Sequence, residues 1–207
     1  MFDFDIAVYL HDFFKQEQGF TPTEATIIVM TFAVGAVLGG IGGGIIGQKI
    51  YNSQYKTSLP IVIGCFQISA CIPVISLINW EPGAIDSSLM ATKGTARLLE
   101  QSPVYILAIL GGLFASSTGP NMKAILLNVN TPSTRGSVFT LMYLFDSVGK
   151  GVGPAAVAAG VSLLGGRVIC FNIAMLGWVA SGLCMIAIYF TMTADEAEAR
   201  ARIRASG

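Results

Sequence analysis

The sequence predicts an all-α integral membrane protein with five full transmembrane helices and part of another. First, five long apolar runs separated by short polar breaks account for most of the 207 residues. Second, the mean hydropathy is +0.68 and only 12% of residues are charged, about half of the roughly 25% found in soluble domains. Third, the runs show no two-residue alternation, which excludes the strands of a membrane barrel. Helices remain, because hydrocarbon requires that backbone groups pair internally.

Each of the five runs reaches the roughly 20 residues that a helix needs to cross about 30 Å of hydrocarbon. We therefore expect a transmembrane domain over residues 24–192. Residues 1–23 are expected to be the outer end of a truncated helix followed by an external loop, and residues 193–207 a cytoplasmic tail. The predicted spans are residues 24–48, 58–79, 103–127, 136–164 and 168–192.

The distribution of basic residues predicts the orientation, because Lys and Arg near short loops favour the cytoplasmic side. One side of the five spans collects Lys49, Lys56, Lys123, Arg135, Arg200, Arg202 and Arg204. The other side collects only Lys15, Lys93, Arg97 and Arg167, over a longer total loop length. This bias places the C-terminal tail in the cytoplasm and the N-terminal residues outside.

The N-terminal residues suggest a piece of a larger protein. The first five residues, Met-Phe-Asp-Phe-Asp, are acidic where a secretory signal is basic, and no apolar segment precedes a cleavage site. Nothing visible would export this N-terminus. We therefore expect a preceding helix to be missing, with Met1–Phe14 as its outer end.

The first span contains a strict four-residue glycine repeat. In lipid, helix association depends on van der Waals contact, so such a G-x-x-x-G stripe predicts a tight seam between two helices. Static packing is one interpretation. The alternative is bending or sliding, since seven glycines in thirteen residues exceed what packing requires. The repeat consists of Gly35, Gly39, Gly43 and Gly47.

Two later spans are predicted to be interrupted. The third repeats the small-residue spacing more weakly and then breaks at Pro120. The fourth contains Gly149 and Gly153 followed by Pro154, where we expect a kink, since proline deletes one helical hydrogen bond. Interrupted helices near polar residues are typical of transporters.

An aromatic and ionic stripe follows one face of the fourth span. Phe139, Tyr143, Asp146 and Lys150 are spaced i, i+4, i+7 and i+11, so they share this face. Asp146 lies ten residues after Gly136, about 15 Å along the helix, which places it close to the bilayer midplane. Lys150 follows one turn later, the favourable order for an i, i+4 pair.

A charge at this depth costs at least about 2.5–3.5 kcal/mol, so both side chains are expected to face protein or water. One interpretation is a neutralised pair that only fixes helix packing. The other, which we favour, is a substrate contact, proton relay or gate. The residues proposed for this path are Phe139, Tyr143, Asp146 and Lys150.

Weaker polar candidates lie on the third span. Ser117 and Asn121 are four residues apart beside Pro120, and we expect them to line the same cavity. Lys123 lies near the cytoplasmic end, where snorkelling is the simpler explanation. No serine, cysteine or carboxylate constellation predicts an enzyme or a metal site, and no cofactor is expected. Dispersed basic residues and zero net charge give no sign of a nucleic-acid partner.

The run T-P-S-T-R-G-S-V-F-T-L-M-Y-L-F-D-S-V-G-K-G-V-G-P, from Thr131 to Pro154, resembles a cytoplasmic loop and the next helix of a major facilitator superfamily transporter. In that superfamily P-x-x-R-G and then G-x-x-x-G-P recur. The loop motif consists here of Pro132, Arg135 and Gly136.

The end of the first span, G-G-G-I-I-G-Q-K-I-Y-N, resembles the helix and loop that carry the superfamily signature G-x-x-x-D-R-x-G-R-K. This sequence departs from the signature, because Gly47 stands where the acid would be. Gln48 and Lys49 stand where the arginine would be. The resemblance therefore does not imply a charge-relay role for this loop.

On this alignment the five spans resemble helices eight to twelve of a twelve-helix carrier, and Met1–Phe14 the outer end of helix seven. The resemblance implies most of the C-terminal six-helix half of the major facilitator fold, and a missing N-terminal six-helix half as partner. It also implies a cavity lined by the first, third and fourth spans. The G-P-N before the loop motif is similar to spinster-like and related organic-solute carriers.

The implied function is secondary active transport of a small organic solute by alternating access in a lipid bilayer. Coupling to protons or to Na⁺ remains open. The alternative is a non-transporting membrane fragment or scaffold that associates with partner helices through the glycine stripe.

Overall fold

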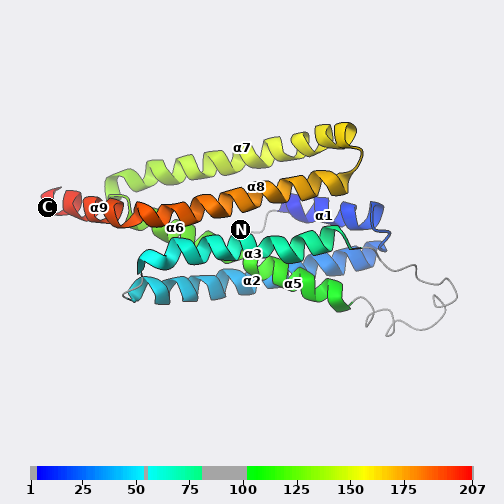
Figure 1. Ribbon diagram of the computed structural model, residues 1–207, viewed down its shortest axis with the longest axis horizontal. Helices are drawn as coiled ribbons and strands as arrows, with labels where there is room; N and C mark the ends of the chain where they lie inside the picture. The colour runs from blue at the N-terminus through cyan, green and yellow to red at the C-terminus, as the bar shows by residue number, and fades with distance from the viewer. Residues whose placement is uncertain (1–3, 54–55, 81–101, 207) are drawn as a thin grey trace.

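The computed structural model describes residues 4–53, 56–80 and 102–206, which form helices and short turns (Figure 1). Lys93 and Arg97, which entered the charge count, lie outside the described residues. The helices run along one long axis as an elongated bundle. Their bounds are α1 Phe4–Gln16, α2 Pro22–Asn52, η1 Lys56–Ser58, α3 Leu59–Ile78, α5 Ser102–Ser116, α6 Thr118–Asn128, α7 Pro132–Leu164, α8 Arg167–Ala187, η3 Ile188–Phe190 and α9 Met192–Ser206.

Within the described ranges, five stretches of helix are long and apolar enough to cross a membrane. Two of them combine neighbouring elements, since α5 continues into α6 and α8 into η3. The predicted all-α fold class with five spanning helices is confirmed. The spans are Pro22–Asn52, Leu59–Ile78, Ser102–Asn128, Pro132–Leu164 and Arg167–Phe190.

The third span is interrupted at Ser117 rather than at the predicted Pro120. Pro120 is the third residue of α6, where a backbone N–H has no helical partner in any case. A proline is therefore tolerated at this position. The interruption precedes the proline because the proline begins the new helix instead of ending the old one.

The motif at Pro132, Arg135 and Gly136 begins α7 and does not form the predicted loop. Thr131 is extended, and Pro132 takes the first helical position, where its fixed φ suits a helix start. Arg135 Nε donates to the carbonyls of Leu127 at 3.1 Å and Asn130 at 3.3 Å. Arg135 thus satisfies carbonyls at the end of α6 and holds the α6–α7 turn closed.

The run at Gln48 and Lys49 is likewise helical rather than a loop, because α2 continues to Asn52. Gln48 Nε2 donates to Asn52 Oδ1 at 3.1 Å, one turn later. Ser53 ends the helix, since its N–H and Oγ both donate to the carbonyl of Ile50. Among the described residues, neither Gln48 nor Lys49 forms an ion pair that would relay charge.

The bundle has two ends, each with its own apolar cluster. The α1 end holds the α1–α2 turn and a cluster that includes Phe13, Phe14 and Val104. The α9 end holds the α2–α3 and α6–α7 turns and a second cluster, which includes Leu59 and Ile125. Between the ends, α2 packs along α5, and α3 lies against both α5 and α8.

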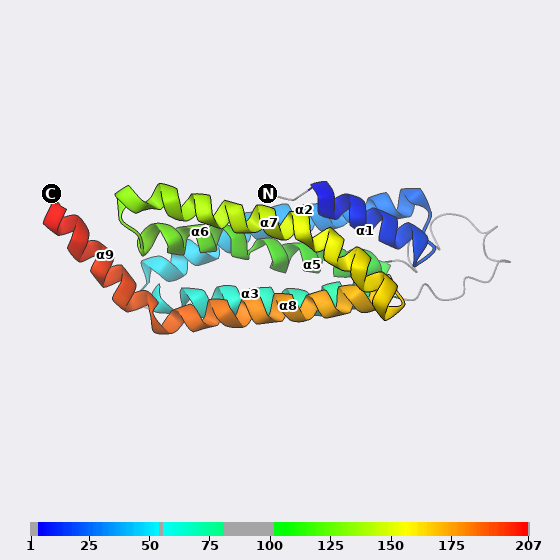
Figure 2. The same ribbon diagram turned by 90° about the horizontal axis from the view of Figure 1, so that it is seen from above.

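The C-terminal tail forms the helix α9, which leaves α8 at an angle (Figure 2). Met192 is fully buried in the α9-end cluster. Glu196 is also buried, and it accepts a 2.9 Å hydrogen bond from the Tyr51 hydroxyl and pairs with Arg200. A hydrogen bond between Arg200 and Tyr51, together with the negative charge of Glu196, raises the pKa of the Arg200 guanidinium. Together these contacts dock α9 onto the end of α2.

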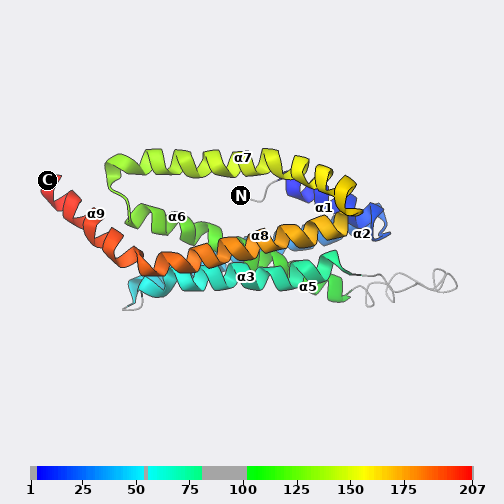
Figure 3. The ribbon, with the colours of Figure 1, turned by 45° about the horizontal axis from the view of Figure 1, so that its top comes forward.

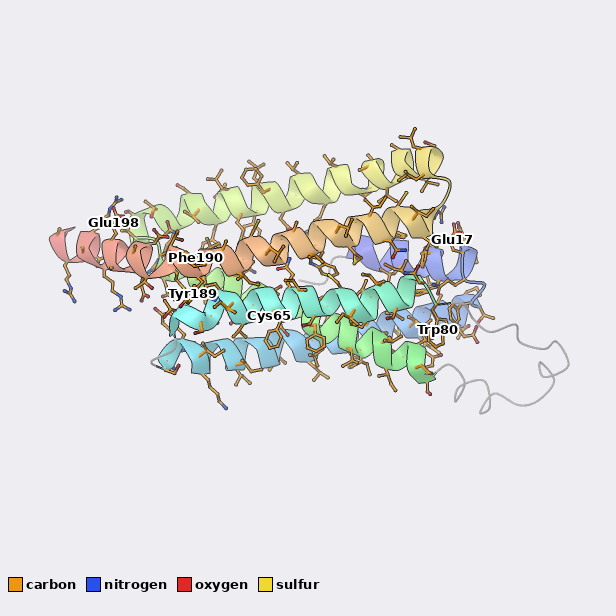
Figure 4. All side chains as sticks on the ribbon, in the orientation of Figure 1. Glu17, Cys65, Trp80, Tyr189, Phe190 and Glu198 are labelled. Atoms are coloured by element: carbon orange, nitrogen blue, oxygen red, sulfur yellow. The ribbon has the colours of Figure 1, made fainter. Side chains whose placement is uncertain are left out.

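The opposite end of the bundle ties α1 to α8. Glu17, just after α1, lies near the start of α8 (Figure 4), where its carboxylate pairs with Arg167 Nε at 3.6 Å. A second nitrogen of Arg167 donates to Gln16 Oε1 at 2.8 Å. The first helix is therefore anchored to the bundle by charge as well as by its buried phenylalanines.

The helix α7 stands apart from the others. It runs along one side of the bundle and meets α8 and α6 (Figure 3). None of its residues is buried, whereas α2, α3 and the α5–α6 span each contain several buried residues. The α7 span is therefore only loosely covered by the other described helices.

Candidate functional site

The four glycines of the α2 repeat lie against α5 and α6 at the same four-residue spacing. A Cβ added to any of them would lie less than 3 Å from an atom of the facing helix. The pairs are Gly35 with Ile109, Gly39 with Leu113, Gly43 with Ser117 and Gly47 with Asn121. At Gly35, Gly39 and Gly43 the nearest facing atoms belong to the backbone, so the two backbones touch there and leave no room for a larger residue, whereas at Gly47 the facing atoms belong to the Asn121 side chain.

Ser117 and Asn121 are buried in the seam. Ser117 Oγ donates to the carbonyls of Leu113 at 2.6 Å and Gly39 at 3.2 Å. Asn121 Nδ2 donates at 2.9 Å to the carbonyls of Ser117 and Gly43. The sequence predicted that both side chains line one cavity. In the structure, the glycines bring the helices so close that both side chains are buried between them and pack the seam.

Asn121 still reaches a small cavity at the α9 end of the seam. This cavity, of about 440 Å³, is also lined by Gln48, Tyr51 and Asn128. Ser117 is not among its lining residues. The two residues therefore share the seam, and only Asn121 also lines this cavity.

The predicted stripe of Phe139, Tyr143, Asp146 and Lys150 lies on α7, and one end of this α7 stripe faces α6. Lys123 on α6 places its Nζ 5.7 Å from the centre of the Tyr143 ring. This is a cation–π distance. Phe139 lies one turn earlier on the same face of α7 and is half-buried.

The other end of the stripe faces α1 and α8. Pro154, Val157 and Val161 continue the spacing from Lys150 by four, seven and eleven residues. These three residues line a cavity of about 320 Å³ together with residues of α1 and α8, among them Phe171. Since both ends face the bundle, the middle of the stripe faces the space between α7 and the other helices.

Asp146 and Lys150 occupy that middle. Lys150 Nζ donates to Asp146 Oδ2, forming the predicted i, i+4 ion pair. The Asp146 side chain remains 51% exposed and the Lys150 side chain 36% exposed. The pair is therefore accessible from the interior space and is not enclosed by side chains of another described helix.

Gly149 and Gly153 do not form a seam like that of α2. A Cβ added to either would meet no atom within 4 Å. Pro154 lies inside a continuous α7, which curves towards α8 near its C-terminal end (Figure 3). Proline removes one helical hydrogen bond, which is a usual cause of such bending.

Gly149 opens onto a larger cavity that the sequence did not predict. Its volume is about 850 Å³, and its lining is mainly aromatic and aliphatic. The aromatic residues come from α1, α2 and α8, which are far apart in the sequence. They are Phe13, Phe14, Phe32, Phe171 and Trp178.

The family model of the Major Facilitator Superfamily matches residues 1–206. The chain belongs to the major facilitator superfamily. This confirms the resemblance at the level of the superfamily, while the spinster-like subtype stays a prediction. Comparisons with curated proteins and with solved structures find no match.

Membership of the major facilitator superfamily makes the chain an integral, multi-pass membrane protein. The superfamily consists of transporters of solutes rather than enzymes. Among the described residues, no three His, Cys, Asp or Glu side chains gather in a group that could hold a metal ion.

Lys123 of this major facilitator chain was not predicted to belong to the polar path. Snorkelling would carry its ammonium to the end of the span, but the structure directs it to Tyr143. Its position offered a signal, since Lys123 lies five residues, more than one turn, before the end of α6 at Asn128.

Proposed function

We propose that this chain moves a small organic solute across the membrane by alternating access, as a secondary active carrier. The observation that carries the proposal is the stripe of α7, which presents two aromatic rings and an ion pair to the interior of the bundle. Intramembrane charges at such positions mark substrate or ion pathways. Aromatic faces suit contact with an organic solute.

The proposal includes a partner, a complementary six-helix half that lies against α7. Support comes from α7 itself, which has no buried residue. Two halves that rock about a shared site give alternating access.

The scaffold alternative required that the glycine stripe of α2 bind a partner helix. The structure offers no support for it, because α5 and α6 cover the stripe within the chain. Gly40 and Gly42, which do lie open, do not continue the four-residue spacing. We therefore do not propose this alternative.

The transport proposal is tested by uptake into proteoliposomes that contain this chain, alone and with a six-helix N-terminal half. We expect saturable uptake of small organic solutes by the two halves together. A proton gradient and a Na⁺ gradient, imposed separately, identify the coupling ion. Absence of saturable uptake for anionic, neutral and cationic solutes alike would refute the proposal.

The proposed orientation places the α9 end in the cytoplasm. On a background without the four native cysteines, Ser133→Cys near the start of α7 should be protected from an impermeant thiol reagent in intact cells. Ser162→Cys near the other end of α7 should react. Both positions are exposed, so access to the reagent depends on the side of the membrane. The reverse pattern of labelling would invert the topology.

A further inference from the structure

Three charged side chains lie more than one turn from an end of any described span. They are Lys123, Asp146 and Lys150. Asp146 and Lys150 form an ion pair, whereas no carboxylate among the described residues pairs with Lys123. The interior of the described bundle therefore holds one positive charge in excess.

The Lys123 ammonium, which carries this excess charge, does not lie where avoidance of hydrocarbon alone would place it. A lysine that only avoids hydrocarbon directs its ammonium to the end of the span. Lys123 instead directs it over the Tyr143 ring, on the face of α7 that also carries Asp146. Cation–π contact stabilises the ammonium there but leaves its charge unneutralised.

An apolar cavity opens further along α7 from this charge. The cavity of about 850 Å³ has Gly149 in its wall, six residues and so about 9 Å along α7 from Tyr143. Its volume falls within the roughly 300–1,000 Å³ of small-molecule sites. Phe13, Phe171 and Trp178 contribute aromatic rings to its lining.

We propose that the site binds an organic anion, whose acid group pairs with Lys123 beside Tyr143 and whose apolar body occupies the aromatic cavity. This inference rests on the proposed transport function and names its substrate class. A cation is disfavoured because it would add to the positive excess. A neutral solute would leave the Lys123 charge unpaired.

The test compares three probes that share one ring system and differ in charge. They are naphthalene-2-sulfonate, the neutral naphthalene-2-sulfonamide and trimethyl(2-naphthyl)ammonium. Equilibrium dialysis measures their binding to the full chain in detergent, where no translocation is needed. We expect the sulfonate to bind at least about tenfold more tightly than the other two, as expected for a charge-assisted contact.

Substitutions at Lys123 locate the effect. Lys123→Gln should weaken sulfonate binding about tenfold and leave sulfonamide binding unchanged, whereas Lys123→Arg should keep the preference for the anion. Lys15→Gln, which removes an exposed lysine at the end of α1, should change neither probe. Unchanged thermal unfolding of each variant without ligand shows that folding is intact.

Equal binding of the three probes, or no binding of any, would overturn the inference. So would a preference for the anion that survives Lys123→Gln. Uptake of the same probes by proteoliposomes separates this result from the transport proposal. If the cation is carried, transport stands and the substrate class falls. If the sulfonate binds but no probe is carried, the anion site stands and the transport proposal falls.

Discussion

Replacing Gly39 by alanine is expected to destabilise the bundle by more than about 3 kcal/mol, at or above the upper end of the usual cost of overpacking. The reason is the added Cβ, which would lie 2.0 Å from the backbone carbonyl oxygen of Leu113. A backbone atom cannot rotate away, so α2 and α5 must separate along the seam. Thermal unfolding in detergent, followed by tryptophan fluorescence, measures the loss.

Gly40→Ala is the matched control, because a Cβ at Gly40 meets no atom within 4 Å. Alanine also favours the helix by up to about 1 kcal/mol over glycine, so this variant should be as stable as the parent or more so. Gly39→Leu should prevent assembly, while Ile41→Leu, at an exposed position, should be tolerated. Equal stability of Gly39→Ala and Gly40→Ala would refute the seam.

The seam combines shape with hydrogen bonding. Close backbones let Ser117 and Asn121 of the facing helix reach the carbonyls of Gly39 and Gly43. Hydrogen bonds between helices and small-residue contacts are the main attractions available in lipid, since the solvent is itself apolar. The part of the bundle formed by α2, α5 and α6 is therefore rigid, which sets it apart from the loosely covered α7.

The sequence predicted the spans well because length and hydropathy are local properties of each run. It also identified the face of α7 that carries Asp146 and Lys150, since helical spacing alone decides which residues share a face. The helix starts were harder to predict. Pro132 resembled a loop residue in the family motif, although proline is also a favoured first residue of a helix.

Contacts between distant parts of the chain could not be predicted. Asn121 is polar, and only the approach of the α2 glycines makes it a seam residue as well as a cavity residue. The direction of Lys123 depends on where α7 lies, and the aromatic cavity needs Phe13 and Trp178 from opposite ends of the sequence. Side-chain spacing within one helix carries no information on these distances.

Asp146→Asn is expected to abolish uptake while changing the free energy of unfolding by less than about 1 kcal/mol, the range of an accessible ion pair. The small effect on stability follows from the exposure of the pair, in which the Asp146 side chain is 51% exposed. The large effect on uptake follows from its place on the face of α7 that looks into the bundle. Uptake and thermal unfolding should be measured on the same preparation.

The double variant, Asp146→Asn with Lys150→Met, separates a path residue from a packing residue. If Asp146 and Lys150 only neutralise each other, Asp146→Asn leaves an uncompensated Lys150 and loses stability. Removal of both charges then restores folding and uptake together. If the pair contacts the solute or gates its path, the double variant folds but does not transport. We expect the second result, because Tyr143 and Phe139 place rings beside the pair and Pro154 lets α7 bend next to it. Full uptake by the double variant would reduce Asp146 and Lys150 to packing residues and would leave Lys123 as the sole charge of the path.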